Sequence, residues 1–285
     1  MDINQKVKCC QLDLLKELDR ICKKRDIPYF LIGGTLIGAI RHEGFIPWDD
    51  DLDVGLLWEH YDRLKEACEA ELDPAYELHD WHMDPHSPHP FYKLKIRGTH
   101  YPEEVSASSG MNDGIFIDIF PYDNAPDDEK LRKRQGRQVF LLRRILQLRC
   151  GFSLGKGSPV KKLLYGILKL LSSVRSVESW KHSFEALRQR YNHGTTQIAT
   201  NMCGAYSYQR ESKPRVWLET VTDHVFEGMM FRIPENYDGF LRSCYGDYMQ
   251  LPPEDQRIGI HHVQDVDFGD YAIRTKLADS DNSIH

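Results

Sequence analysis

The sequence predicts an α/β fold of the α+β kind: a mixed sheet core with a helical insertion and a C-terminal segment packed on the core. Three observations support this prediction. Short β-prone runs alternate with amphipathic runs over residues 25–125, residues 127–195 have a helical pattern, and residues 200–270 mix aromatic residues with turns. We therefore expect a single domain over residues 1–275 and a flexible tail over residues 276–285.

The composition is that of an ordinary globular protein, with 41% hydrophobic and 28% charged residues among 285. The net charge of -6 does not fit a protein that grips nucleic acid along its whole surface, so no nucleic-acid partner is expected. No apolar run approaches the roughly 20 residues that span a bilayer, and no signal-peptide pattern opens the sequence. We therefore expect a cytoplasmic protein.

The first elements follow from apolar spacing and from turn residues. Apolar residues recur at helical spacing over residues 3–25, and the short apolar run 29–32 predicts a buried strand. A Gly-Gly turn then leads into a short helix at 35–41. The remaining predictions up to residue 121 are a loop at 42–47, an acidic strand at 48–54, a helix at 59–71, a loop at 73–90, a strand at 91–96, a polar connection at 98–113 and a strand at 114–120 that Pro121 closes.

Three helices are predicted in the insertion, at residues 127–149, 161–174 and 179–191. The second is basic and amphipathic, which fits a helix lying on a membrane surface. The buried face of a bundle helix explains the same pattern and is the more common case.

Three aspartates in the acidic strand are spaced by two residues: Asp49, Asp51 and Asp53. On a strand their carboxylates share one face, whereas Asp50 points to the other. Three like charges on one face repel each other unless a cation lies among them or some are protonated. Magnesium, or manganese in its place, suits an all-oxygen site.

A fourth carboxylate, Asp118, lies in the apolar strand at 114–120, where an unpaired charge is costly. A strand beside the acidic strand would bring it to the same metal ions. Usually a run of aspartates is only a solvated loop.

Phosphate-binding groups are predicted from the turn and from nearby cations. Glycines between a strand and a helix let the backbone approach a phosphate, and free N–H groups at the helix start can hold it. Cations near the acidic strand can offset phosphate charge. The candidates are Gly33, Gly34, Thr35, Arg41, Lys93, Lys95 and Arg97. The order strand, Gly-Gly, helix, Asp-x-Asp and a later lone Asp is the layout of a nucleotidyltransferase site, which catalyses two-metal phosphoryl transfer.

Three segments carry a family resemblance. Residues 32–53, IGGTLIGAIRHEGFIPWDDDLD, resemble the signature of the LicD family, which includes bacterial phosphorylcholine transferases and, in animals, fukutin and fukutin-related protein. Residues 114–121, GIFIDIFP, resemble the family's strand with the third carboxylate, and residues 245–253, YGDYMQLPP, resemble its C-terminal block. The resemblance extends from about residue 25 to about residue 270.

The resemblance implies a nucleotidyltransferase-like fold and a defined reaction. A phospho-alcohol would pass from a CDP-activated donor to a sugar hydroxyl of a cell-surface glycan, such as lipopolysaccharide or teichoic acid, with release of CMP. CDP-choline is the best-known donor, and relatives move ribitol phosphate or phosphonates. Carried over by position, Asp51 and Asp53 are metal ligands, Asp118 is a further ligand or the base, and Asp49 is a weaker candidate.

Two other classes of protein have the same fold. One is a nucleotidyltransferase that consumes an NTP, and the other is a non-catalytic scaffold, which should have lost one of the three carboxylates. The glycan or lipid-linked acceptor suggests contact with the inner face of the membrane.

For several further candidate residues, a role in ligand binding competes with a purely structural role. Trp48 is a candidate for choline binding by cation–π contact, but a core position is the more common explanation for such a ring. His261 and His262 are candidates for phosphate contact or acid–base chemistry. The His-rich stretch at 79–89 has spacings seen in zinc sites, but its prolines favour a solvated loop.

Overall fold

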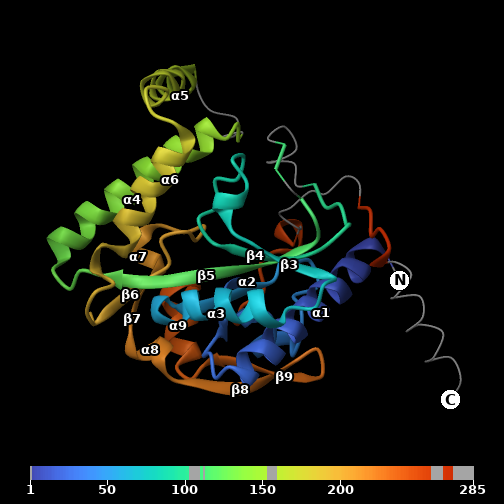
Figure 1. Cartoon of the computed structure of the whole chain (residues 1–285). Coiled ribbons are helices and arrows are strands. Elements are labelled where there is room, and N and C mark those ends of the chain that lie inside the picture. The colour runs from blue at the N-terminus through green and yellow to red at the C-terminus, as the bar shows by residue number, and fades with distance from the viewer. Residues whose placement is uncertain (1, 103–109, 112, 153–158, 258–265, 272–285) are drawn as a thin grey trace, which may run out of the picture.

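The computed structural model describes residues 2–271 apart from 103–109, 112, 153–158 and 258–265. Within these residues the main sheet has seven strands and is mixed, as predicted (Figure 1). Its order is β1-β2-β5-β4-β3, with β6 pairing with β5 and β7 with β6. The strands are β1 Phe30–Leu31, β2 Asp53–Leu57, β3 Tyr76–His79, β4 Tyr92–Ile96, β5 Phe116–Ala125, β6 Ile198–Thr200 and β7 Ser212–Pro214.

β5 is the centre of the sheet. It pairs parallel with β2 and antiparallel with β4 and β6. Its side chains alternate between two faces, so Ile117 and Ile119 face one way and Asp118 the other. The hydroxyl of Tyr61 donates to the carbonyl of Ile119 at 2.9 Å and joins a helix to the first face.

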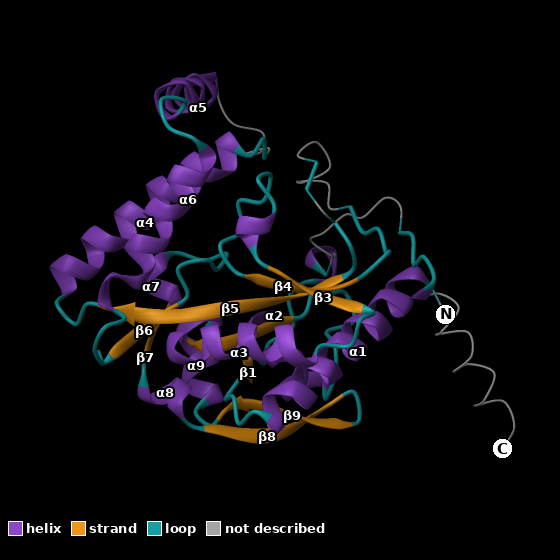
Figure 2. Ribbon diagram, viewed as in Figure 1, coloured by secondary structure: helices purple, strands orange, loops and turns teal. Residues whose placement is uncertain are grey.

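Helices α1 Ile3–Lys24 and α3 Trp58–Glu71 lie along that face of the sheet (Figure 2). α1 begins in a capping box, in which Asp2 accepts from the N–H of Gln5 and the Gln5 side chain accepts from Asp2. Its buried stripe, which includes Leu14 and Leu18, matches the predicted helical spacing. The core is therefore formed between α1, α3 and the inner face of β5.

The C-terminal part of the chain returns to this core. β6 and β7 extend the main sheet, and a separate hairpin packs beside β1 and helix α2, Gly33–His42. The remaining elements are α7 Tyr208–Glu211, α8 Val216–Glu219, the hairpin strands β8 Val221–Phe226 and β9 Met229–Pro234, α9 Tyr237–Tyr245 and the 3-10 helix η3 Glu254–Gln256.

Outside the acidic segment, two predictions of local structure are wrong. The expected loop at 73–90 contains β3 and the 3-10 helix η1, Trp81–Met83, because β3 pairs with β4. Pro121 does not close its strand, since β5 continues to Ala125. Pro121 lies between the last pairing with β4, at Ile119, and the first with β6, at Asp123, so its missing N–H costs no bond on that side.

The helical insertion consists of α4 Glu129–Arg149, α5 Pro159–Ser172 and α6 Val177–Arg188, followed by the 3-10 helix η2, Gln189–Tyr191. α4 and α6 pack side by side, and α5 projects from them away from the sheet (Figure 1). The bundle interpretation of α5 is wrong, because its apolar side chains are exposed. Their exposed fractions run from 46% to 72% and belong to Val160, Leu163, Leu164, Ile167, Leu170 and Leu171.

Across the described residues, no helix is both long enough and apolar enough to cross a membrane.

Candidate active site

The parallel pairing of β2 with β5 brings two of the predicted aspartates together. Asp53, the first residue of β2, is the register partner of Asp118 in β5. They are 65 residues apart in the sequence, and their side chains line one cavity of about 300 Å³. We call this space the carboxylate cavity; its acidic lining residues are Asp51, Asp53, Asp118 and Glu211.

The acidic segment is not a continuous strand, which corrects the predicted geometry. β2 begins only at Asp53, and residues 49–52 have no regular structure. The carboxyl groups of Asp49 and Asp51 still meet, because a hydrogen bond joins them. Their proximity therefore comes from the loop conformation rather than from strand alternation.

The Gly-Gly turn gives the carboxylates room. Gly33 has a φ of 60°, which favours glycine, and a Cβ there would lie 2.8 Å from Asp53 Oδ2. A Cβ on Gly34 would lie 2.1 Å from Asp49 Oδ2. Both glycines begin α2, so the positive N-terminal end of that helix lies beside these carboxyl groups.

Thr35 joins the start of α2 to the start of β2. It is buried, and its hydroxyl accepts a hydrogen bond of 2.9 Å from the backbone N–H of Asp53. The described contact is therefore with the start of β2. Whether Thr35 also touches a phosphate stays a prediction.

Negative charge accumulates at this corner. Burial, followed by the neighbouring charges of Asp51 and Asp50, raises the pKa of Asp49 to about 8. A cation beside these groups would offset that charge. The donor set is all oxygen, which matches the preference of Mg²⁺ for carboxylates and substrate phosphates.

The three aspartates of the carboxylate cavity do not converge as one ready-made ligand set. In the described part of the chain, the one trio of potential ligands within 4.8 Å of one another is found elsewhere, at His82. Asp118 is also engaged by a cation, because Lys93 Nζ lies 2.8 Å from Asp118 Oδ1. A metal ion fits Asp51 and Asp53 better than it fits Asp118.

Lys93 lies in the cavity, but its described charge partner is a carboxylate rather than a phosphate. It is 4% exposed, and its ammonium lies 3.3 Å from the centre of the Phe116 ring. Lys95 shares its face of β4 but does not line the cavity; burial and Lys93 lower its pKa to about 8. Arg97 is exposed, outside β4, and pairs with Glu77 at 2.8 Å.

Two further candidates lie beside the cavity rather than in its lining. Arg41 donates to the backbone carbonyl of Tyr248 at 2.7 Å, which ties α2 to the C-terminal block. Trp48 is half-buried, and the Arg257 guanidinium lies 5.4 Å from the centre of its ring. His261 and His262 lie outside the described residues.

Sequence reasoning missed the aromatic and cationic part of the cavity. Tyr206 and Tyr245 meet edge to face, with ring centres 5.3 Å apart, and Phe91 and Phe120 lie 4.3 Å apart. Arg143 of α4 reaches the cavity and donates to the carbonyl of Gly204 at 2.6 Å. Helical spacing predicted α4, but it did not show which of its arginines turns inward.

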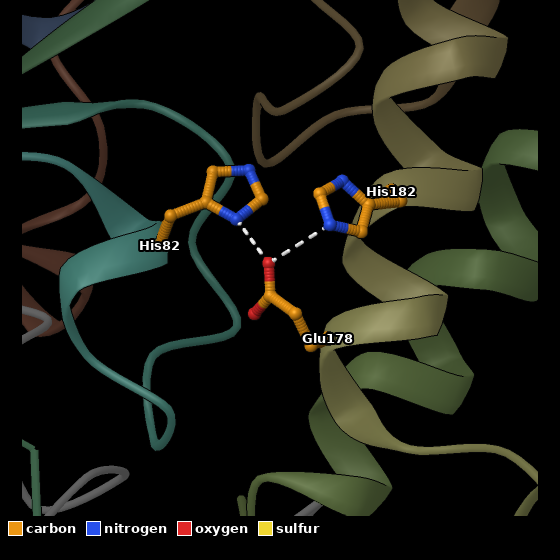
Figure 3. Close-up of side chains that lie close together, drawn as sticks. All are labelled: His82, Glu178 and His182. Carbon is orange, nitrogen blue, oxygen red and sulfur yellow. Dashed lines mark hydrogen bonds and ion pairs between the residues drawn. The ribbon is translucent and has the colours of Figure 1, made fainter.

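The His-rich stretch divides between two places: His89 lines the carboxylate cavity, and His82 forms contacts of its own with α6. His82 Nδ1 lies 2.6 Å from Glu178 Oε1, and His182 Nε2 lies 3.4 Å from the same oxygen (Figure 3). The other nitrogen of His82 lies 2.9 Å from Glu185. The two imidazoles stack between the carboxylates, so ion pairing joins η1 to α6.

Comparison with known proteins gives one matching family. The sequence model described as "LicD/FKTN/FKRP, nucleotidyltransferase domain" matches residues 26–139. This range covers α2, the acidic segment, β5 and the first half of α4, so it includes the three aspartates of the cavity.

Individual relatives extend the match. The lipopolysaccharide cholinephosphotransferase LicD of Haemophilus influenzae is 29% identical over 258 residues, which cover 90% of this chain and 94% of that protein. The human ribitol 5-phosphate transferase FKRP is 37% identical over 118 residues, which cover 40% of this chain. That match spans about a fifth of FKRP, namely 21% of its length.

Proposed function

We propose that this chain is a phospho-alcohol transferase of the LicD type and that it transfers phosphocholine from CDP-choline to a sugar hydroxyl of a cell-surface glycan. The observation that carries the proposal is the pairing of Asp53 with Asp118 across β2 and β5, beside Asp51 and the Gly-Gly turn. The nearly full-length similarity to a lipopolysaccharide cholinephosphotransferase supports choline as the alcohol and a glycan as the acceptor.

The reaction exchanges the phosphoanhydride bond of the donor for a phosphate ester bond to the sugar. The acceptor hydroxyl attacks the phosphorus that carries choline, a new P–O bond to the sugar forms, and the P–O bond to CMP breaks. The hydroxyl proton passes to a carboxylate, and CMP leaves with the electron pair of the broken bond. Positioning and charge stabilisation supply most of the rate gain in such transfers.

We assign the roles of the aspartates by their surroundings. Asp51 and Asp53 would hold Mg²⁺, which supplies charge stabilisation for the phosphates when bound. Asp118 would accept the proton, and Lys93 holds that carboxylate in place through the 2.8 Å ion pair. The N-terminus of α2 and the half-buried Arg143 of α4 would offset the charge of the leaving CMP.

Aromatic rings in the carboxylate cavity favour a cationic alcohol. Tyr206, Tyr245, Phe91 and Phe120 line it, and aromatic faces attract a quaternary ammonium group. We expect Tyr245→Leu to raise the KM for CDP-choline about tenfold and to change the KM for CDP-ribitol little. Tyr245→Phe, which keeps the ring, should behave like the parent. Equal losses with both donors would argue against a choline-binding role.

The reaction itself is tested by incubating the protein with CDP-choline, CDP-ribitol or CDP-glycerol in the presence of Mg²⁺. Slow hydrolysis should release CMP, most rapidly from CDP-choline, and EDTA should stop it. Thermal shifts with ATP, CTP and UTP form the control. Stabilisation by an NTP alone, without CMP release from any CDP-alcohol, would favour the nucleotidyltransferase alternative.

We also propose that α5 rests on the inner, cytoplasmic face of a membrane, near a lipid-linked acceptor. Six apolar side chains of α5 are exposed, and the helix carries three lysines and no acidic residue. A basic amphipathic helix of this kind binds anionic lipid by burying its apolar face at the headgroup boundary.

Sedimentation with phosphatidylglycerol vesicles tests this contact. The parent should sediment with them and not with phosphatidylcholine vesicles, and Leu163→Glu with Leu170→Glu should abolish sedimentation. Val216→Glu, at an exposed valine of α8, is the matched control. A parent that stays in solution, or a dimer through α5 detected by light scattering, would overturn the membrane assignment.

A further inference from the structure

A groove along α4 lies beside the carboxylate cavity. Two further cavities, of about 520 and 430 Å³, follow one another along this helix. The first shares Arg143, Ala205 and Tyr206 with the carboxylate cavity, and the second shares Phe140 and Tyr208 with the first. The three spaces are therefore neighbours along α4, and we call the outer two the α4 groove.

The α4 groove is lined by cations although the whole protein carries a net charge of -6. Its lining holds five basic side chains and, within the described residues, a single acidic one, Glu129, which pairs with Lys133 at 2.6 Å. The basic residues are Arg132, Lys133, Arg137, Arg143 and Arg144. Such a concentration of one sign attracts an anionic ligand.

None of the four arginines in this lining has a carboxylate partner within ion-pair distance in the part of the chain that the structure describes. Arg132 donates to two backbone carbonyls instead. Arg143 donates to the carbonyl of Gly204, and Arg144 to the side-chain oxygen of Gln147. Guanidinium groups bind phosphate or carboxylate through paired hydrogen bonds, so their donors remain suited to such groups.

Aromatic side chains alternate with these cations. Phe140 and Tyr206 are exposed by 63% and 38%, and Tyr208 packs against α4 where Gly136 leaves no side chain in the way. The exposed rings offer an apolar surface on which sugar rings can stack. The neighbouring arginines offer positive charge to anionic groups on those sugars. The groove therefore matches a glycan with anionic groups better than it matches a neutral one.

We propose that the α4 groove binds the acceptor and that this acceptor is a glycan carrying phosphate groups. The proposal rests on the proposed transferase function and adds the place where the second substrate binds and the arginines that hold its phosphate groups. The bound glycan would extend along α4, with its reacting hydroxyl passing Arg143 and Tyr206 to reach Asp118 in the carboxylate cavity.

The test measures binding of a fluorescent mannopentaose that carries one phosphate monoester, against the same mannopentaose without phosphate. We expect the phosphorylated probe to bind at least tenfold more tightly, and Arg137→Gln and Arg144→Gln each to weaken it about five- to tenfold. Arg134→Gln is the matched control, because Arg134 is an exposed arginine of the same helix that lines a separate small cavity.

Three results would overturn the proposal: equal binding of the two probes, an equal loss in Arg134→Gln, or binding of a twelve-residue oligothymidylate as tight as that of the phosphorylated glycan. Release of CMP from CDP-choline distinguishes this failure from failure of the transferase function. If only the groove assignment is wrong, the parent still hydrolyses the donor. If the transferase function is wrong, the parent releases no CMP, whatever the probes do.

Discussion

The carboxylate cavity and the helical insertion carry opposite charge and are held together by different interactions. The cavity concentrates acidic groups at the start of β2, where glycines and a helix N-terminus make room for them. The insertion is basic, with eight basic residues and one acidic residue in α4. It is joined to the core through buried polar contacts, among them Arg188 with Asp123 and Lys181 with the carbonyls of Trp81 and Asp84.

This difference suggests that the cavity serves catalysis and that the contacts between the insertion and the core serve stability. Substitutions in the cavity should change catalysis with little effect on stability, because its charged groups repel one another and serve a ligand. Substitutions where the insertion meets the core should change stability, because those charges are paired within the protein. The following predictions test this division, from the largest expected effect to the smallest.

Asp53→Asn should reduce turnover by roughly a thousandfold or more, since losing a metal-binding carboxylate removes about 4 kcal/mol of transition-state stabilisation. Thermal unfolding should show a fold at least as stable as the parent. CMP release from CDP-choline is the measurement, and Asp50→Asn, on a residue that does not line the cavity, is the control. Near-parental turnover in a folded Asp53→Asn protein would remove Asp53 from the site.

Arg188→Met should cost about 3–5 kcal/mol of unfolding free energy, because it leaves the buried carboxylate of Asp123 without its cation. The two groups lie 3.3 Å apart and are almost fully buried. Arg242→Met, which breaks the solvent-exposed pair with Asp238, should cost far less, because water screens that pair. Urea unfolding measures both, and similar values for the two variants would contradict the idea that the insertion is fastened by buried charge.

Gly34→Ala should lower turnover about tenfold and leave stability nearly unchanged. The new Cβ would displace the flexible carboxyl end of Asp49, which lies 2.1 Å from its position. Gly166→Ala, in α5, is the matched control: nothing lies within 4 Å of its Cβ, and alanine should stabilise that helix by up to about 1 kcal/mol. Unchanged turnover in Gly34→Ala would show that Asp49 has no part in the reaction.

His82 should give the smallest effect and one that depends on pH. Burial alone lowers its pKa, but hydrogen bonds to Glu185 and Glu178 outweigh burial and raise the pKa above 6.5. Its stabilising effect is therefore complete below about pH 6.5 and is lost as the pH rises through the raised value. Neighbouring His182 contacts the same carboxylates and is kept in both proteins.

Unfolding of the parent and of His82→Gln at pH 6 and pH 8.5 measures this effect. The parent should be the more stable at pH 6, by about 0.5–1 kcal/mol, and the difference should shrink at pH 8.5. A difference that is constant with pH would show that the contact between η1 and α6 does not depend on the charge of His82.

The spacing of apolar and β-prone residues along the sequence predicted some elements closely and others poorly. The helical spacing of α1 and the β-prone run of β5 appear where they were expected, because each is a property of consecutive residues. The stretch 73–90 was expected to be a loop but contains β3, which forms because it pairs with β4. The histidines and prolines of this stretch do not indicate a strand.

The candidate site shows the same limit. The order of Gly34, Asp53 and Asp118 along the chain pointed to one site, and β2 and β5 do bring the last two side by side. The sequence did not indicate that Lys93 pairs with Asp118, because that contact depends on the register of β4 against β5.

By itself, the sequence determined which chemistry-bearing groups are present and in what order, since residue type and spacing are local properties of the chain. Only the tertiary structure decided how these groups are used. It built the carboxylate cavity from a loop and two strands rather than from one acidic strand, turned Arg143 inward and left the apolar face of α5 uncovered. These outcomes depend on packing between segments far apart in sequence, and periodicity within one segment carries no information about which partner covers it.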